Sequence, residues 1–236
     1  MNDILFFTDC MSIGPEYYNE NKKYPYLVKE YLGKKINREI DIELIPGSGE
    51  TTGEALNKLK DIVQRGKRYD FVIFAYGIND ALPRGLKRET RGKIIRAMYS
   101  LKFNEKMRLF ARAYFLNPLE FIMQLVRKPL HYNDINTFIG NVNYILEQLG
   151  SLADKKLIYI SMNPVLNYRF VNSNIHIGEY NDKLLEVLDK KCFDYINVCK
   201  LFSSGRTEKY LADDKFHYSR IGHRAVADEI IKLLDK

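Results

Sequence analysis

The stretch from residue 4 to residue 14 most constrains the fold, because four consecutive apolar residues run directly into a polar turn. The apolar run covers residues 4–7, and Thr8, Asp9 and Cys10 follow it. A short apolar run bounded by turn residues is typical of a strand buried on both faces, and such strands belong to parallel sheets covered by helices. Ligands bind such sheets at the carboxyl ends of the strands. Cys10 therefore stands where a reactive group would be useful.

Apolar runs and segments with helical periodicity alternate along the rest of the chain. Further strands are expected at residues 38–45, 69–76, 156–162 and 195–198. Helices are expected at residues 24–33, 55–63, 134–152, 180–188 and 221–234, and another is expected to begin at about Ser12. Five strands alternating with helices predict an α/β fold, a three-layer α/β/α sandwich with a five-stranded parallel sheet and right-handed crossovers.

Length and composition predict one domain. The chain has 236 residues with 46% hydrophobic content and no Pro/Gly/Ser-rich linker, so we expect a single domain over residues 1–236. The first strand begins too early to leave room for a signal peptide, and no apolar stretch of about 18 residues could span a bilayer. We expect a cytoplasmic protein, or one peripheral to the inner face of the membrane.

The cysteines and histidines predict neither disulfides nor metal. There are three cysteines, with no CxxC spacing, which argues against a disulfide framework and a structural zinc site. Cys192 and Cys199 flank an apolar run and are expected to pack in the core. No ligand cluster for a metal is visible, and no cofactor is expected.

One block of the chain carries its positive charge. Residues 84–130 contain 12 Lys and Arg against Glu89, Glu105 and Glu120, so this block carries +9 where the whole chain carries +7. Its apolar residues recur at helical spacing, and Pro118 is expected to break its second helix from its third. We interpret the block as a basic amphipathic helical insertion within the domain, acting as a lid or docking subdomain.

The insertion also suggests partners. Basic amphipathic helices bind anionic membrane surfaces, and a basic lid attracts anionic partners such as an acyl carrier. Nucleic acid is not expected, because the block lacks a recognised binding motif and is as rich in apolar as in basic residues.

Four polar turns follow the strands in an order and spacing that resembles the SGNH (GDSL-like) hydrolase superfamily. The turns contain Asp9-Cys10, Gly49, Gly77-x-Asn79-Asp80 and Asp214-x-x-His217. The resemblance spans the chain apart from the basic block. It departs from the family in the first turn, where the family's Gly-Asp-Ser is Thr8-Asp9-Cys10, so that a thiol replaces the nucleophilic serine.

The resemblance implies a role for each of these residues. Cys10 would be the nucleophile, His217 would take and return its proton, and Asp214 would orient the imidazole. The backbone N–H groups of Cys10 and Gly49 and the amide of Asn79 would form the oxyanion hole. The supporting residues would be Asp9, Gly77 and Asp80. The helix expected after Cys10 and the imidazole of His217 should make the thiol more anionic.

Other assignments remain open at this point. Cys10 could be inert in a relic site, Ser12 could be a displaced nucleophile or a helix cap, and Asp213 competes with Asp214 as the orienting carboxylate. The remaining histidines are expected to be structural; they are His131, His176 and His223. The glycine-rich turn at residues 47–53 has one residue too many for a dinucleotide-binding motif, so a flavodoxin-like nucleotide binder is the weaker interpretation.

The function that we expect is acyl hydrolysis of a small-molecule ester or thioester through a Cys-His-Asp triad and a thioester acyl-enzyme. One alternative is an O-acyltransferase that acts on a glycan or another small acceptor, because a thioester is a good acyl donor. Another is a catalytically inactive binding protein with the same fold, recruited by its basic insertion.

Overall fold

The computed structural model describes residues 3–15, 19–100, 104–191 and 193–236, and it confirms the predicted α/β fold. Its five strands form one parallel sheet in the order β2-β1-β3-β4-β5. The strands are β1 (Asp3–Asp9), β2 (Asp41–Gly47), β3 (Tyr69–Ala75), β4 (Ala153–Ile160) and β5 (Asp194–Ile196). Strand β1, which lies between β2 and β3, is buried from Ile4 onward, as its apolar run predicts.

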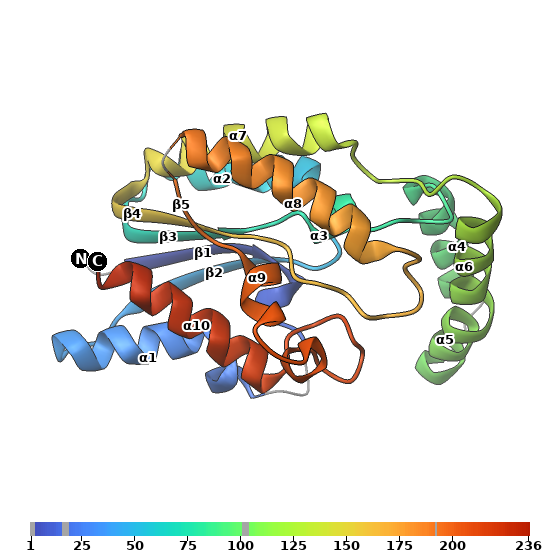
Figure 1. The fold of residues 1–236 in the computed structure, drawn as a ribbon, viewed down its shortest axis with the longest axis horizontal. Helices are drawn as coiled ribbons and strands as arrows, with labels where there is room; N and C mark the ends of the chain where they lie inside the picture. Colours follow the sequence, from blue (N-terminus) through green and yellow to red (C-terminus); the bar gives the residue numbers. More distant parts are fainter. Residues whose placement is uncertain (1–2, 16–18, 101–103, 192) are drawn as a thin grey trace.

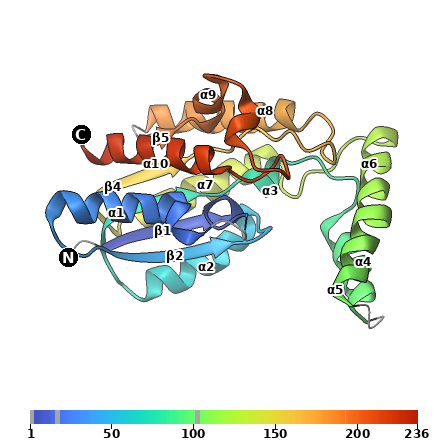
Figure 2. The ribbon, with the colours of Figure 1, turned by 90° about the horizontal axis from the view of Figure 1, so that it is seen from below.

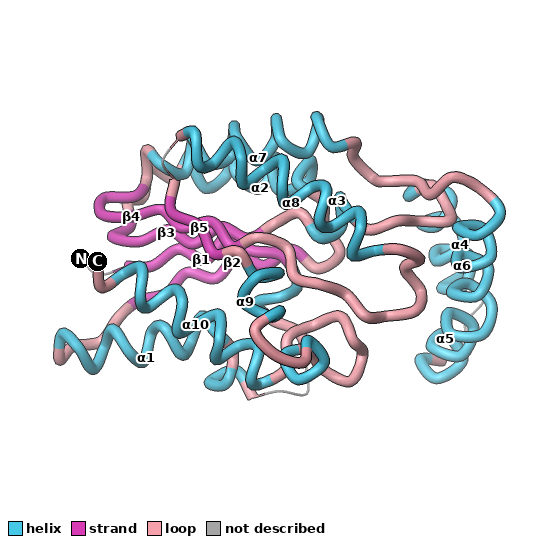
Figure 3. Tube along the Cα trace, in the orientation of Figure 1, coloured by secondary structure: helices cyan, strands magenta, loops and turns pink. Residues whose placement is uncertain are grey.

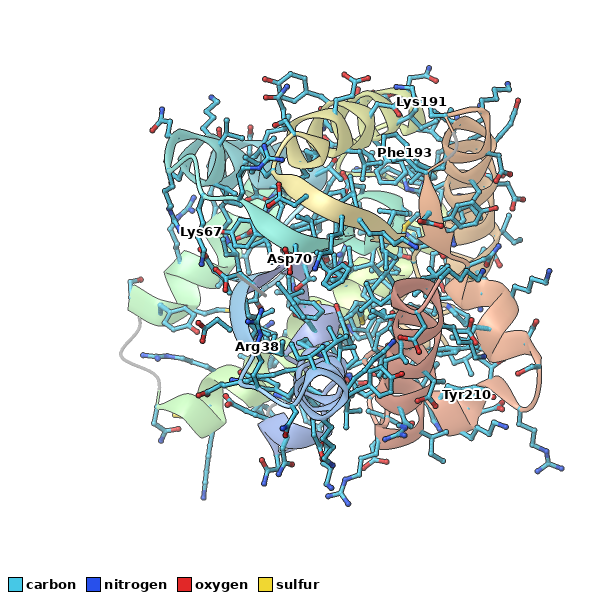
Figure 4. The ribbon with its side chains drawn as sticks, turned by 90° about the vertical axis from the view of Figure 1, so that its left-hand side faces the viewer. Arg38, Lys67, Asp70, Lys191, Phe193 and Tyr210 are labelled. Carbon is cyan, nitrogen blue, oxygen red and sulfur yellow. The ribbon has the colours of Figure 1, made fainter. Side chains whose placement is uncertain are left out.

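Helices cover both faces of the sheet, which makes three layers (Figures 1 and 3). One face is covered by α1 (Tyr24–Ile36) and α10 (Arg220–Leu234). The other is covered by α2 (Thr52–Gln64), α7 (Ile135–Gly150) and α8 (Ser173–Lys190). Figure 4 looks at the amino ends of the strands, where Lys67 and Asp70 lie; the carboxyl ends point the other way. The loops that follow the strands therefore meet at one edge of the sheet.

The loops at the carboxyl edge carry several short elements. They are the 3₁₀ turn η1 (Cys10–Ser12), the 3₁₀ turn η2 (Glu20–Lys22), α3 (Ile78–Ala81), α9 (Val198–Ser203) and the 3₁₀ turn η4 (Thr207–Tyr210). The expectation of a helix beginning near Ser12 was wrong, because the chain makes only one 3₁₀ turn there. Helix α8 also begins seven residues before the predicted start, at Ser173.

Residues 84–100 and 104–130 form a helical arm that projects beyond the carboxyl edge of the sheet (Figures 1 and 2). Its helices are α4 (Arg88–Ser100), α5 (Glu105–Ala111), the π-helical turn η3 (Arg112–Leu116) and α6 (Asn117–Val126). The arm leaves and rejoins the sandwich at one point. There the N–H of Arg84 donates to the carbonyl oxygen of Leu130 at 2.8 Å, and the N–H of Leu130 donates back at 3.0 Å.

Pro118 does not separate two helices, contrary to the sequence-based expectation. The chain stays helical from α5 through η3 into α6, with Pro118 in the first turn of α6. A proline removes one N–H donor and crowds the carbonyl group four residues earlier. The wider π-helical turn directly before it provides room for the ring, so the helix continues.

His223 ties α10 to the segment that follows Cys10, and it is fully buried. Its Nε2 lies 3.0 Å from the carbonyl oxygen of Gly14, and its Nδ1 accepts a hydrogen bond from the N–H of Tyr24 at 3.3 Å. The ring is therefore neutral, with its proton on Nε2. Burial lowers the pKa of His223 to about 4, and the nearby Lys23 and His217 act in the same direction.

We predict that this histidine destabilises the fold in acid. Its pKa is about 4 in the folded protein and about 6.5 in the unfolded chain, so only the unfolded chain takes up the proton between these values. The contribution is complete above pH 6.5 and is lost as the pH falls towards 4, by about 3 kcal/mol in total. Urea unfolding across this range should show the loss in the wild type and a flatter profile in His223→Asn. Equal slopes for both proteins would contradict the prediction.

Candidate active site

Cys10 lies at the end of β1 and is 7% exposed. Asp9, the last residue of the strand, accepts a hydrogen bond from the N–H of Met11 at 3.0 Å and so fixes the turn that presents the thiol. Burial raises the pKa of Asp9 to about 7, although this hydrogen bond opposes the shift. A buried strand thus delivers a thiol to the carboxyl edge, as the sequence predicts.

His217 and Asp214 form a hydrogen-bonded pair in the turn before α10. Nδ1 of His217 lies 2.6 Å from Oδ2 of Asp214, while Oδ1 of Asp214 accepts from the N–H groups of Phe216 and His217 at 2.9 and 3.0 Å. Burial raises the pKa of Asp214, but the hydrogen bonds from the His217 ring and the backbone outweigh it, and the net shift is downward. An ionised Asp214 places the proton of the imidazole on Nδ1 and leaves Nε2 free to accept one.

Gly14 packs directly against the ring of His217. A Cβ atom at Gly14 would lie 2.4 Å from Cδ2 and 2.9 Å from Nε2 of that ring, so any other residue would displace the imidazole. The N–H of Gly14 donates to the carbonyl oxygen of Cys10 at 2.9 Å. The turn that carries the thiol therefore also sets the position of the imidazole.

Cys10 lies where two cavities meet, and Asp214 and His217 line both of them. The first cavity has a volume of about 580 Å³, and its other lining residues include the apolar Ile13, Pro15, Tyr26 and Leu44. The second has a volume of about 300 Å³ and is lined by Gly49 and Asn79 together with several arginines. The structure thus brings all five sequence-predicted residues of the triad and oxyanion hole to one place.

The amide of Asn79 and the backbone of Gly49 face this region. Nη2 of Arg84 donates to Oδ1 of Asn79 at 3.1 Å, and Nδ2 of Asn79 donates to the carbonyl oxygen of Glu50 at 3.1 Å. Nδ2 keeps a second N–H for a ligand. Gly49 has a φ of +70°, and a Cβ there would meet nothing within 4 Å. The left-handed backbone at this position is what favours glycine.

Asp80 fastens the loops of the site to one another, and it is fully buried. Its carboxylate accepts hydrogen bonds from Nδ2 of Asn133 and from the N–H and hydroxyl groups of Thr52, which begins α2. Burial raises the pKa of Asp80, and these hydrogen bonds oppose that shift. Gly77 caps α3, the short helix that carries Asn79 and Asp80. The supporting role expected of both residues is therefore structural.

The protonation state of Cys10 differs from the sequence-based expectation. Burial raises the pKa of the thiol and the charge of Asp9 acts in the same direction, whereas the N–H groups of Gly49 and Cys10 lower it. The downward effects are smaller, and η1 is too short to supply a helix dipole. The thiol therefore keeps its proton at neutral pH.

The other sequence candidates lie away from the reacting groups. Ser12 is fully buried, where it donates to the carbonyl oxygen of Asp9 at 3.1 Å and accepts from the hydroxyl of Thr8 at 2.6 Å. It caps no α-helix and lines neither cavity. His131 and His176 contact each other, with ring centroids 4.7 Å apart. Cys192 falls outside the described residues.

Sequence reasoning missed the arginines of the second cavity. They are Arg84, Arg91, Arg112 and Arg169. Three of them come from the helical arm, but Arg169 comes from the loop after β4. Because β4 is a parallel strand, the loop that follows it lies at the carboxyl edge of the sheet, and this was the available signal for Arg169. Among the described residues, no group of three or more His, Cys, Asp or Glu side chains could hold a metal ion.

Residues 11–230 match the family model described as GDSL-like lipase/acylhydrolase. The match begins one residue after Cys10, so it does not test the identity of the nucleophile. A search of curated proteins found no match.

Solved structures show the same fold. A lipase/acylhydrolase from Enterococcus faecalis has a TM-score of 0.65 and 18% identity over 99% of this chain and 95% of its own. Axe2, an acetylxylan esterase from Geobacillus stearothermophilus, has a TM-score of 0.63 and 15% identity over 98% and 93% of the two chains.

We predict that Cys10 reacts with iodoacetamide as a neutral thiol does. Its raised pKa keeps the thiolate scarce at pH 7.5, so alkylation should be at least about tenfold slower than that of free cysteine. The rate should still climb above pH 9, which separates a high pKa from poor access. Peptide mapping assigns the modified cysteine. A rate that reaches its plateau below pH 7 would instead indicate a thiolate–imidazolium pair.

Proposed function

The chain belongs to the GDSL-like lipase/acylhydrolase family, and from this premise we propose that it is an ester hydrolase with Cys10, His217 and Asp214 as its catalytic triad. One observation carries the proposal. The thiol, the Asp214–His217 pair and the oxyanion-hole candidates Gly49 and Asn79 line the same cavity. A nucleophile, an oriented base and hydrogen-bond donors around one space are what acyl transfer requires.

The first half of the reaction forms an acyl-enzyme. The sulfur of Cys10 attacks the carbonyl carbon of the ester while Nε2 of His217 takes the thiol proton. Because the resting thiol is neutral, this proton transfer accompanies the attack. The carbonyl oxygen becomes an oxyanion that accepts hydrogen bonds from Asn79 and the backbone of Gly49, and each such donor is worth about 3 kcal/mol. The C–O bond then breaks, and the alcohol leaves with the proton from His217.

The second half releases the acid. His217 takes a proton from a water molecule as that water attacks the thioester carbon. The carbon–sulfur bond breaks, Cys10 regains its proton from His217, and a carboxylic acid leaves. Throughout, Asp214 holds the proton on Nδ1 and stabilises the imidazolium that forms twice in the cycle. The apolar part of the first cavity suits the acyl group, because Ile13, Pro15 and Leu44 line it.

The test is the mass of the acyl-enzyme. Brief exposure of the wild type to p-nitrophenyl acetate should add one acetyl group, detected by intact-mass spectrometry, and Cys10→Ala should acquire none. His217→Ala should form the adduct at least about 100-fold more slowly, because general base catalysis typically contributes 10²–10⁴-fold. Cys199→Ser is the control and should acylate like the wild type.

Other outcomes would identify the alternatives. Acetyl transfer to an added sugar in preference to water would make the protein an acyltransferase. If no adduct forms, or if the adduct persists in Cys10→Ala, the triad is wrong, and a catalytically inactive binding protein becomes the better description.

We also propose that the helical arm lies on an anionic membrane surface. Several of its large apolar side chains are more than half exposed; they are Tyr99, Phe110, Tyr114, Phe115, Ile122, Leu125 and Val126. The arm also carries exposed basic side chains: Lys93, Arg96, Lys106, Arg127 and Lys128. Exposed apolar and basic side chains together suit an interface with anionic lipid. No helix in the described parts of the chain is long and apolar enough to cross a bilayer.

Vesicle co-sedimentation tests the arm. The wild type should bind phosphatidylglycerol-containing vesicles and not pure phosphatidylcholine. Lys128→Glu should weaken this binding by about tenfold or more, because each basic residue near an anionic surface contributes about 1 kcal/mol. Phe115→Ser should weaken it as well. The matched control is Tyr144→Ser, since Tyr144 is 54% exposed but lies on α7. Equal binding to both kinds of vesicle, or equal loss in the control, would contradict the proposal.

A further inference from the structure

The second cavity carries an excess of positive charge beside the reactive thiol. Four arginines line it, and the buried Glu120 is the carboxylate that pairs with two of them. Glu120 lies 3.1 Å from Nε of Arg91 and 3.8 Å from Nη2 of Arg169. Asp214 also lines the cavity and pairs with His217. Four guanidinium groups against the carboxylates of Glu120 and Asp214 leave a surplus of two positive charges.

Arg84 is the strongest indication that the cavity binds an anion. It is 7% exposed, and its guanidinium lies 4.9 Å from the ring centroids of both Tyr132 and Phe170. Its Nη2 donates to Asn79, but its Nε has no hydrogen-bond partner among the described residues. Nε of Arg169 likewise has no hydrogen-bond partner among the described residues. A buried guanidinium with an unsatisfied donor is costly unless a ligand accepts from it.

The positively charged arginines of the second cavity also repel one another. Burial lowers the pKa of Arg84, and the charges of Arg91 and Arg169 act in the same direction, whereas those of Tyr132 and Glu120 oppose the shift. Glu120 is close enough to Arg91 for an ion pair, but the two groups are not aligned for a hydrogen bond. The described side chains therefore compensate the guanidinium groups only in part, and a bound anion would complete the compensation.

We propose that the second cavity binds a phosphate group on the alcohol part of the ester substrate. Planar guanidinium groups pair bidentately with phosphate oxygens. A phosphate monoester carries close to two negative charges and matches the surplus better than a carboxylate would. The apolar first cavity takes the acyl group, which leaves the alcohol for the arginines. This inference rests on the proposed function for the ester, but the phosphate site itself does not.

The arrangement also couples the anion to catalysis. Arg84 lines the cavity and hydrogen-bonds Oδ1 of Asn79, and this bond turns the amide N–H₂ group away from Arg84, where it can serve the oxyanion. A phosphate that engages Arg84 thus binds next to the residue that orients Asn79. Phosphate binding should consequently favour turnover as well as affinity.

Calorimetric titration with inorganic phosphate and pyrophosphate tests the site without any turnover. The wild type and Cys10→Ala should both bind, and Arg112→Gln and Arg169→Gln should each weaken binding at least tenfold. Arg112→Gln leaves both partners of Glu120 in place, so it guards against misfolding as the explanation. The matched control is Arg68→Gln: Arg68 is exposed, pairs with Asp154 and directly precedes β3, at the amino end of that strand. No binding, or equal loss in the control, would overturn the proposal.

Matched esters then test the substrate. The wild type should turn over 1-acetylglycerol 3-phosphate or 6-O-acetylglucose 1-phosphate with a kcat/KM at least tenfold above that of the unphosphorylated ester, and Arg112→Gln should lose this preference. The two pairs distinguish a glycerol phosphate from a sugar phosphate. Turnover without any phosphate preference overturns the phosphate site and keeps the hydrolase. Phosphate binding without turnover of any ester keeps the site and counts against the proposed function.

Discussion

The buried carboxylate of Asp80 is the interaction on which the geometry of the candidate site depends. It accepts hydrogen bonds from Thr52 at the start of α2 and from Asn133 after the helical arm, while its own helix carries Asn79. One side chain therefore fixes three segments that are far apart in the sequence. A buried carboxylate is costly unless its hydrogen bonds are satisfied. Moving the loops apart would leave Asp80 without its partners, and this cost holds the loops together.

Electrostatics divides the site into three parts with different charge. The thiol of Cys10 is buried beside Asp9 and stays neutral, the Asp214–His217 pair carries the negative charge of the Asp214 carboxylate, and the arginine-lined cavity is positive. A neutral thiol is a weaker nucleophile than a thiolate, so the proposed mechanism depends on His217 as a base. A nucleophile that keeps its proton until it attacks is typical of serine sites, whereas many cysteine sites hold a thiolate that is formed in advance.

The sequence predicts the architecture well, because each strand is a short apolar run between helical segments and the rules of parallel sheets leave few arrangements. It also brings Cys10, Gly49, Asn79, Asp214 and His217 to one edge, since all follow strands or the last turn. It does not predict the thiol's protonation state, which depends on burial in three dimensions. It misses Arg169, because the place of this residue after a parallel strand indicates the edge of the sheet but not which side chains of the loop line the cavity. The predicted helix break at Pro118 was wrong for a local reason, since a π-helical turn accommodates the proline.

The neck of the helical arm has an evolutionary consequence. Because the paired backbones of Arg84 and Leu130 close the arm at its base, its two ends lie side by side, and the sandwich has the same gap to bridge whatever stands between them. Such a segment can be exchanged, shortened or enlarged as a module without disturbing the order of the strands. Its root nevertheless touches Asn79, and its helices supply Arg91 and Arg112 to the cavity. Recombination at this neck would therefore replace three of the four arginines of the second cavity in one step and leave Cys10, Asp214 and His217 in place.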